Sequence, residues 1–220
     1  EYGITEVKNV IYPNRVFREK GWLSIKDELG LDYLDCGGSR AFAITDHQVA
    51  HIYLQDESPR FRKEVRSCLE NMEGVEKVLE GDARKEGGLH HHRAGDFVVF
   101  SAEDSWFAYY HWLDDSLAPD FARCIDVHRK YGYDPAELFV DPNISFPTLK
   151  VAQKLVGKKL GFRTNMDLIP LDANLVKGSH GTRPNDPSDC PIIMGHGIKP
   201  SEKMLPSTEV MGYLLNLFQK

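Results

Sequence analysis

The chain has 220 residues, of which 41% are hydrophobic and 27% are charged, proportions typical of a soluble globular protein. Its net charge of −6 at pH 7 argues against a general nucleic-acid-binding surface, which needs an excess of lysine and arginine. No apolar run approaches the roughly 20 residues that span a bilayer, so no transmembrane segment is expected. The length allows one large domain or one and a half ordinary ones.

The strand pattern begins close to the N-terminus. Short strands are expected at 22–25, 33–35, 75–79 and 96–100. Residues 39–54 alternate between apolar and polar side chains and predict two further strands that turn around Asp46-His47-Gln48. The order strand, helix, strand between Ala50 and Leu79 indicates a small α/β unit.

Three helices are expected before the C-terminal region. Asn14 is predicted to cap a short one over 15–20. The clearest helix begins at Ser58-Pro59, with Ser58 as N-cap and Pro59 in the first turn. Residues 150–162 form a basic amphipathic pattern, which suits contact with a membrane or an anionic ligand, or more commonly a solvated surface helix.

Residues 104–146 are rich in aromatic side chains and lack clean periodicity, so they predict an irregular insertion packed against the core. The aromatic residues between Trp106 and Trp112 could stack a base or a sugar. Packing of the insertion onto the core is the more common use of such residues.

The C-terminal segment carries the most specific pattern. A strand at 168–176, interrupted by Pro170, is expected to lead into the turn Gly178-Ser179-His180-Gly181. A polar loop, a second buried run at 191–194 and a helix from about Pro206 follow. Because glycines flank His180, its imidazole is accessible to a ligand, and neutral imidazole binds zinc well.

This order of elements resembles the C-terminal end of the alkaline phosphatase superfamily, in its type I phosphodiesterase/nucleotide pyrophosphatase branch. There, a Gly-x-His-Gly turn supplies a zinc-binding histidine. Residues 91–99, His-His-Arg-Ala-Gly-Asp-Phe-Val-Val, also fit a segment of the cap in that branch, His-x-Arg-x-Gly-Asp followed by apolar residues. The resemblance implies an α/β fold with a partial alkaline-phosphatase-like sheet (1–35 and 163–220), a small α/β cap (36–103) and an irregular aromatic-rich insertion (104–162).

The resemblance further implies a metal-dependent phosphodiesterase or nucleotide pyrophosphatase-like hydrolase that acts on a small phosphoester with one or two ions of zinc or another divalent metal. The nucleophile, a threonine or serine, would precede Glu1, so the chain is expected to be a C-terminal portion that is inert alone. Glu1-Tyr2-Gly3-Ile4 stands where that branch has Ser-Asp-His-Gly-Met. Glu1 could still offer a carboxylate to a metal, but Tyr2 replaces an imidazole. A degenerate relative that binds a phosphorylated ligand without cleaving it is therefore the alternative.

Other candidate ligands lie elsewhere. Asp46-His47 is a rival metal pair, or an acid/base pair, with a solvated hairpin turn as the plain alternative. Asp126 and His128 would share one side of a strand and could meet one ion or substrate group, and Arg129 could meet a phosphate, although salt bridges would also account for them. A third possibility is a mononuclear site built from His180 with Asp46-His47 or Asp126-His128. The run His90-His91-His92 is expected at the surface, since three consecutive side chains cannot face one ion.

The cysteines bear on the compartment. Cys36, Cys68, Cys124 and Cys190 form no Cys-x-x-Cys pair, which favours a reduced, cytoplasmic protein, although pairing in three dimensions stays open. The chain starts at Glu1 without a signal-like segment, for which processing, truncation or nicking would each account. The pattern does not indicate an oligomeric state.

Overall fold

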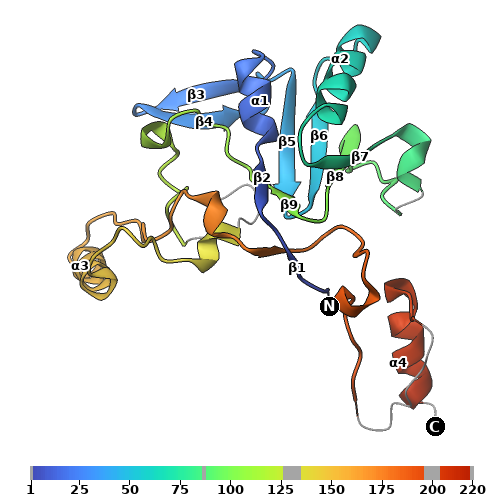
Figure 1. Cartoon of the computed structure of the whole chain (residues 1–220). Helices are drawn as coiled ribbons and strands as arrows, with labels where there is room; N and C mark the ends of the chain where they lie inside the picture. Colours follow the sequence, from blue (N-terminus) through green and yellow to red (C-terminus); the bar gives the residue numbers. More distant parts are fainter. Residues whose placement is uncertain (1, 86–87, 126–134, 196–203, 219–220) are drawn as a thin grey trace. The chain divides into compact units, whose positions relative to one another are not determined.

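The computed structural model describes residues 2–85, 88–125, 135–195 and 204–218. The chain divides into two compact units, Tyr2–Cys190 and a smaller one made of Pro191–Lys220 with Glu1, and each is described by itself. The described residues form four α-helices and several small sheets, which confirms the α/β class (Figure 1). Within the described part, no helix is long and apolar enough to cross a membrane.

The larger unit is centred on a four-stranded antiparallel sheet with the strand order β5-β6-β8-β7. Its strands are β5 (Ala41–Asp46), β6 (Val49–Leu54), β7 (Val75–Glu80) and β8 (Phe97–Ser101). The hairpin β5–β6 pairs Asp46 with Val49, so the turn consists of His47 and Gln48, as predicted. Helix α2 (Pro59–Glu70) connects β6 to β7 and packs against the sheet.

The two helices that contact the sheet have different starts. In α2, the Ser58 hydroxyl accepts a hydrogen bond from the Phe61 backbone N–H, which confirms the predicted N-cap. Helix α1 spans Pro13–Glu19, so the prediction that Asn14 caps it is wrong. The Asn14 side chain is buried instead, where it donates to the carbonyls of Ala43 and Tyr109 and accepts from the Ala43 N–H.

One apolar core lies between this sheet and the two helices. Phe61, Val65 and Leu69 of α2 are buried in it at the i, i+4, i+8 spacing of a single helix face. Phe61 meets Trp22 edge to face, with ring centroids 5.3 Å apart.

Three two-stranded sheets complete the larger unit. A hairpin joins β3 (Ser24–Glu28) to β4 (Leu31–Asp35), and β2 (Asn9–Ile11) runs parallel to β9 (Ser105–Phe107). The third sheet pairs β1 (Thr5–Glu6) with β10 (Gly178–Ser179) in antiparallel fashion. Single 3-10 turns lie at Gly81–Lys85, Asp115–Leu117, Pro135–Leu138, Ala173–Leu175 and Pro187–Asp189.

The aromatic side chains between Trp106 and Trp112 pack inward, as expected. Trp106, Tyr110 and Trp112 are buried, and Tyr110 stacks on Trp112 with a centroid distance of 4.4 Å. These rings fill a second apolar cluster with Val7 and Leu171. They therefore serve packing rather than offering open faces to a base or a sugar. No disulfide joins the four cysteines, all of which the structure describes.

The segment that leads to His180 is less regular than predicted. Instead of a strand at 168–176, it has an isolated bridge between Cys124 and Asp167 and the 3-10 turn Ala173–Leu175. Pro170 lacks the N–H that a strand ladder needs, and the Asp172 carboxylate accepts from the Asn174 N–H to close a turn. Strand pairing is thus confined to β10.

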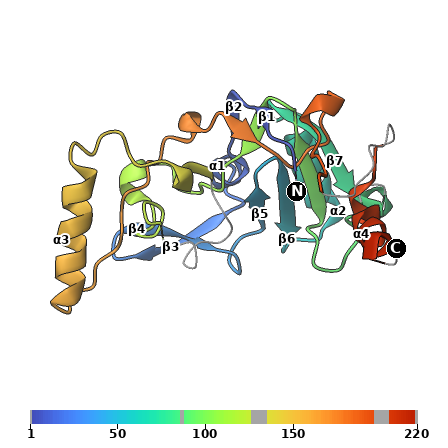
Figure 2. The same ribbon diagram turned by 90° about the horizontal axis from the view of Figure 1, so that it is seen from below.

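Helix α3 (Pro147–Lys159) confirms the predicted basic helix, although it begins three residues earlier because Pro147 suits the first turn. Both Figure 1 and Figure 2 show α3 set apart from the four-stranded sheet.

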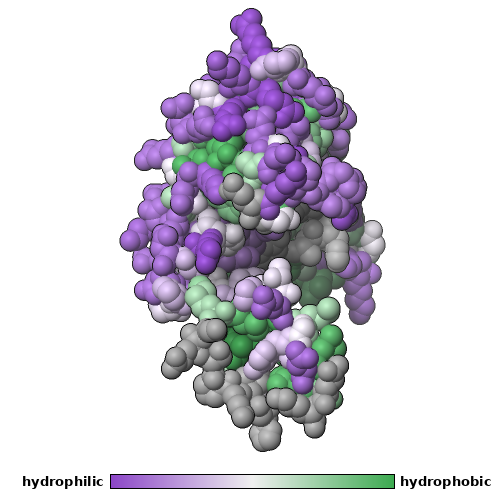
Figure 3. Space-filling view, turned by 90° about the vertical axis from the view of Figure 1, so that its right-hand side faces the viewer, coloured by the Kyte–Doolittle hydropathy of each residue, from purple (hydrophilic) through white to green (hydrophobic). Residues whose placement is uncertain are grey.

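In the smaller unit, α4 (Val210–Phe218) follows a 3-10 turn at Ser207–Glu209 and confirms the predicted closing helix. The predicted buried run at 191–194 is wrong, because its described residues are exposed and irregular. Apolar side chains of α4, such as Met211 and Phe218, are also exposed, and hydrophobic residues are visible at the surface in the lower part of Figure 3.

Candidate functional site

His180 lies directly after β10, and the pairing of β10 with β1 brings it beside the N-terminal residues. The Val7 N–H donates to the Lys177 carbonyl at 3.0 Å, and the strand partners are Thr5 with Ser179 and Glu6 with Gly178. The Tyr2 ring stacks on the His180 imidazole with a centroid distance of 3.6 Å and an interplanar angle of 12°. The two motifs that the sequence singled out at opposite ends of the larger unit therefore meet.

The hairpin turn between β5 and β6 meets the same histidine. The His47 and His180 ring centroids are 4.0 Å apart, with the rings tilted by 31°. His47 has a positive φ of 57°, which is uncommon for a residue other than glycine and is found in two-residue hairpin turns. The turn geometry thus directs the His47 imidazole toward His180. The three rings lie side by side, with His180 between Tyr2 and His47.

Asp46 orients His47. Its Oδ1 atom lies 2.6 Å from His47 Nδ1. The hydrogen bond from His47 is the largest cause that lowers the pKa of Asp46, and burial opposes it while nearby His180 and His51 add to the lowering. Asp46 is therefore a carboxylate at neutral pH and accepts a hydrogen bond from His47 Nδ1, which fixes the orientation of the imidazole.

Gln48 fastens the His180 turn to the sheet. Its buried side chain donates from Nε2 to the carbonyls of Glu103 (2.8 Å) and Ser105 (3.2 Å), and its Oε1 accepts from the Thr182 N–H at 3.4 Å. Its backbone N–H donates to the His180 carbonyl at 3.0 Å. The sequence analysis did not predict a role for Gln48. The only indication in the sequence was a glutamine directly after the Asp46-His47 pair.

Gly181 is needed for this close approach. Its φ is 124°, a conformation that side chains rarely adopt, and an added Cβ would lie 3.3 Å from the Gln48 backbone nitrogen. The glycine that follows His180 therefore has a structural reason as well as giving access to the imidazole. The polar loop after it is held by Glu103, whose carboxylate accepts from the backbone and side-chain amides of Asn185 at 3.0 and 2.7 Å.

The donor chemistry suits a divalent metal, but the donors do not form a complete site. Imidazole and carboxylate are both zinc ligands, and Asp46, His47 and His180 gather at one place. Among the residues that the structure describes, no group of three or more His, Cys, Asp or Glu side chains is arranged to hold an ion. His47 and His180 meet through their ring faces, whereas the lone pairs that bind metal lie in the ring planes. The described residues therefore supply donors of the right type but not a metal-binding arrangement.

The other predicted site residues fall elsewhere. Glu1, Asp126, His128 and Arg129 lie outside the described residues, so their predicted roles stay predictions. The run His90-His91-His92 is exposed, as expected.

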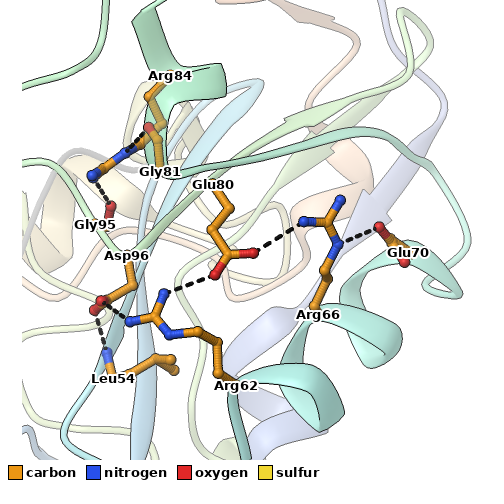
Figure 4. A network of polar contacts seen from close by, with 9 residues as sticks. All are labelled: Leu54, Arg62, Arg66, Glu70, Glu80, Gly81, Arg84, Gly95 and Asp96. Atoms are coloured by element: carbon orange, nitrogen blue, oxygen red, sulfur yellow. Dashed lines mark hydrogen bonds and ion pairs between the residues drawn. The ribbon is translucent and has the colours of Figure 1, made fainter. Parts of the chain in front are cut away.

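The 91–99 element serves the sheet rather than the candidate site (Figure 4). Asp96 accepts from the Leu54 N–H through Oδ2 (2.9 Å) and from Arg62 through Oδ1 (2.7 Å). Arg62 also pairs with Glu80, so Asp96 ties α2 to β6 while Arg62 ties α2 to β7. A Cβ on Gly95 would lie 2.7 Å from backbone atoms of Ile52, and this position has no room for a side chain.

A family model described as type I phosphodiesterase / nucleotide pyrophosphatase matches residues 1–134. The chain belongs to this family. The matched residues of this phosphodiesterase family member include Tyr2, Asp46 and His47, whereas His180 lies beyond them. No curated protein sequence matches the chain.

Among solved structures, the chain is similar to phosphonoacetate hydrolase from Sinorhizobium meliloti 1021, determined with phosphonoacetate and with phosphonoformate. Both matches are at 23% identity with a TM-score of 0.37, and they cover 53% and 54% of this chain. They span only 30% and 29% of the hydrolase chain.

Proposed function

We propose that these residues form part of a metal-dependent phosphoric ester hydrolase, with His180 as a ligand of a divalent ion such as zinc. Family membership supports the reaction class. The observation that carries the proposal is the convergence of Tyr2, His47 and His180, which come from three distant parts of the sequence.

His180 and His47 would each offer a ring nitrogen to the ion, and Asp46 would orient His47 through its hydrogen bond with His47 Nδ1. A bound divalent ion would supply a Lewis acid for the phosphoryl oxygens of a small phosphoester. Gln48 and Gly181 would position the His180 turn without touching the substrate. The nucleophile would come from a segment that precedes these residues, so the 220-residue chain alone would be inert.

Hydrolysis of bis(4-nitrophenyl) phosphate tests the proposal. The full-length gene product should hydrolyse this diester, and the 220-residue chain should not. Replacing His180 by Ala should lower kcat/KM by more than about 100-fold. Substituting a residue that only hydrogen-bonds to a metal ligand already lowers metal affinity or activity by about 10–100-fold. His92→Ala, at an exposed histidine, is the matched control and should leave the rate unchanged. Hydrolysis by the isolated chain, or full activity in His180→Ala, would refute the proposal.

The second candidate is a relative that binds a phosphorylated ligand without cleaving it. Tyr2 favours it, because a phenol ring lies flat on His180 at the position where the resembling enzymes would supply an imidazole. Replacing Tyr2 by His distinguishes the two functions. A hydrolase should retain or gain metal-dependent turnover in Tyr2→His, whereas a binding protein should bind inorganic phosphate and show no turnover in either form.

A further inference from the structure

The apolar face of helix α3 is exposed to solvent and does not pack on a core. Leu149, Val156 and Leu160 follow one another at spacings of seven and four residues, so they share one face. All three are more than half exposed, at 67%, 58% and 69%. Among the described residues of the helix, none is buried. A surface helix ordinarily turns such a stripe inward, and this stripe is turned outward.

The opposite face of α3 is polar and tethers the helix. Lys150 donates to the Asp167 carbonyl at 2.6 Å and pairs with its carboxylate at 3.1 Å. Lys154 pairs with the same carboxylate at 2.6 Å. Gly157 lies against Thr164, since an added Cβ would be 3.0 Å from Thr164 Cγ2. These contacts fix which face points to the protein, so the outward position of the apolar stripe follows from ion pairs.

The charge around the stripe has one sign. Residues 146–163 contain five lysines and arginines and no aspartate or glutamate, although the whole chain has a net charge of −6. Lys150 and Lys154 pair with Asp167, and Arg163 pairs with Asp120. Lys158 and Lys159 are exposed at the end of the helix. Phe146 and Phe162, 72% and 68% exposed, extend the apolar surface at both ends of the segment.

We propose that segment 146–163 docks in the plane of an anionic lipid surface. Such a surface offers an apolar boundary for Leu149, Val156 and Leu160 and negative headgroups for Lys158 and Lys159. A second copy of this chain would bring Lys158 and Lys159 near the same lysines of its partner, and like charges oppose that contact. This inference does not depend on the proposed hydrolase activity.

Sedimentation with vesicles tests the inference. The protein should bind vesicles that contain about one third phosphatidylserine at least about tenfold more tightly than vesicles of phosphatidylcholine alone, since each cation near an anionic surface adds to binding. Binding should weaken between about 0.1 M and about 1 M NaCl, as the screening length shortens. Lys159→Glu should reduce binding roughly tenfold. Lys63→Glu, which makes the same charge change on the exposed side of α2, is the matched control and should not.

The apolar part has its own test. Leu149→Asp with Val156→Asp should abolish vesicle binding while circular dichroism and Tm stay unchanged, because neither side chain is buried. Absence of vesicle binding by the wild-type protein, or equal losses in Lys159→Glu and Lys63→Glu, would overturn the inference. A third result would also overturn it: a dimeric wild-type protein that becomes monomeric in the double variant, with no vesicle binding by either protein. A second copy of the chain would then occupy this face.

Discussion

The four-stranded sheet and the segment that carries His180 are built in different ways. In the sheet, β6 and β8 each pair on both sides, and α2 seals one apolar core. The segment from Asp167 to His180 has only a bridge, one turn of 3-10 helix and the two-residue strand β10. Burial therefore determines the sheet, whereas a few polar contacts to Gln48 and β1 determine where His180 lies. Stability and site geometry should respond to different substitutions.

The largest expected effect is on the sheet core. Phe61 of α2 is buried against Trp22. Phe61→Ala should lower the free energy of unfolding by about 3–5 kcal/mol, because it removes buried apolar surface and leaves a cavity. Leu155→Ala, at a half-exposed position of α3, is the matched control and should cost less than about 0.5 kcal/mol. Urea unfolding measures both. Equal losses would mean that α3 is packed as tightly as the sheet.

The packed region also contains a pH-dependent group. His111 is buried with its Nε2 3.0 Å from the Asp32 carbonyl, and burial lowers the pKa of His111 to about 4. In the unfolded chain the pKa of this histidine is near its ordinary value of 6.5, so the unfolded chain binds more protons than the folded chain between pH 6.5 and pH 4. The free energy of unfolding is therefore full above about pH 6.5 and falls as the pH drops toward 4. Between pH 7 and pH 5 the wild type should lose about 2 kcal/mol more than His111→Gln, whose amide can keep the bond to Asp32 but cannot titrate.

Urea unfolding at pH 7, 6 and 5 measures this difference. His92→Gln removes an exposed histidine and should follow the wild type at every pH. A His111→Gln variant with the same pH dependence as the wild type would show that His111 is as accessible to protons in the folded chain as in the unfolded one.

The smallest of the three effects concerns the link between the two regions. Gln48→Leu removes one hydrogen bond each from the carbonyls of Glu103 and Ser105 and from the Thr182 N–H, and should cost about 1 kcal/mol, because the two carbonyls keep hydroxyl donors from Thr5 and Ser101. Amide hydrogen exchange should accelerate around residues 178–182 more than in β5–β8. Gln55→Leu, at an exposed position, should change neither quantity. Unchanged exchange near His180 in Gln48→Leu would contradict the role of Gln48 in holding the turn.

The sequence predicted the parts of the fold that short-range rules govern. Alternating apolar residues predicted the hairpin β5–β6, and Ser58-Pro59 predicted the start of α2. The Asn14 prediction failed because a buried amide with three backbone partners has the same local sequence as an N-cap. The predicted strand at 168–176 failed because the turn chemistry of Pro170 and Asp172 outweighs the apolar pattern.

The candidate site could be predicted only in pieces. The glycines around His180 and the adjacent Asp46-His47 pair were visible in the sequence, as was the position of Tyr2. Their meeting was not, because it depends on β1 pairing with β10 and on the bond from the Gln48 N–H to the His180 carbonyl. Both contacts join residues far apart in the chain, which periodicity and spacing do not report.

Zinc content tests the proposal that His180 and His47 serve one divalent-metal centre. The full-length protein should keep a fixed ratio of zinc to protein after dialysis, as measured by elemental analysis. His180→Ala and His47→Ala should each lose that zinc, while His92→Ala should keep it. Wild-type zinc content in His180→Ala would show that His180 is not a ligand.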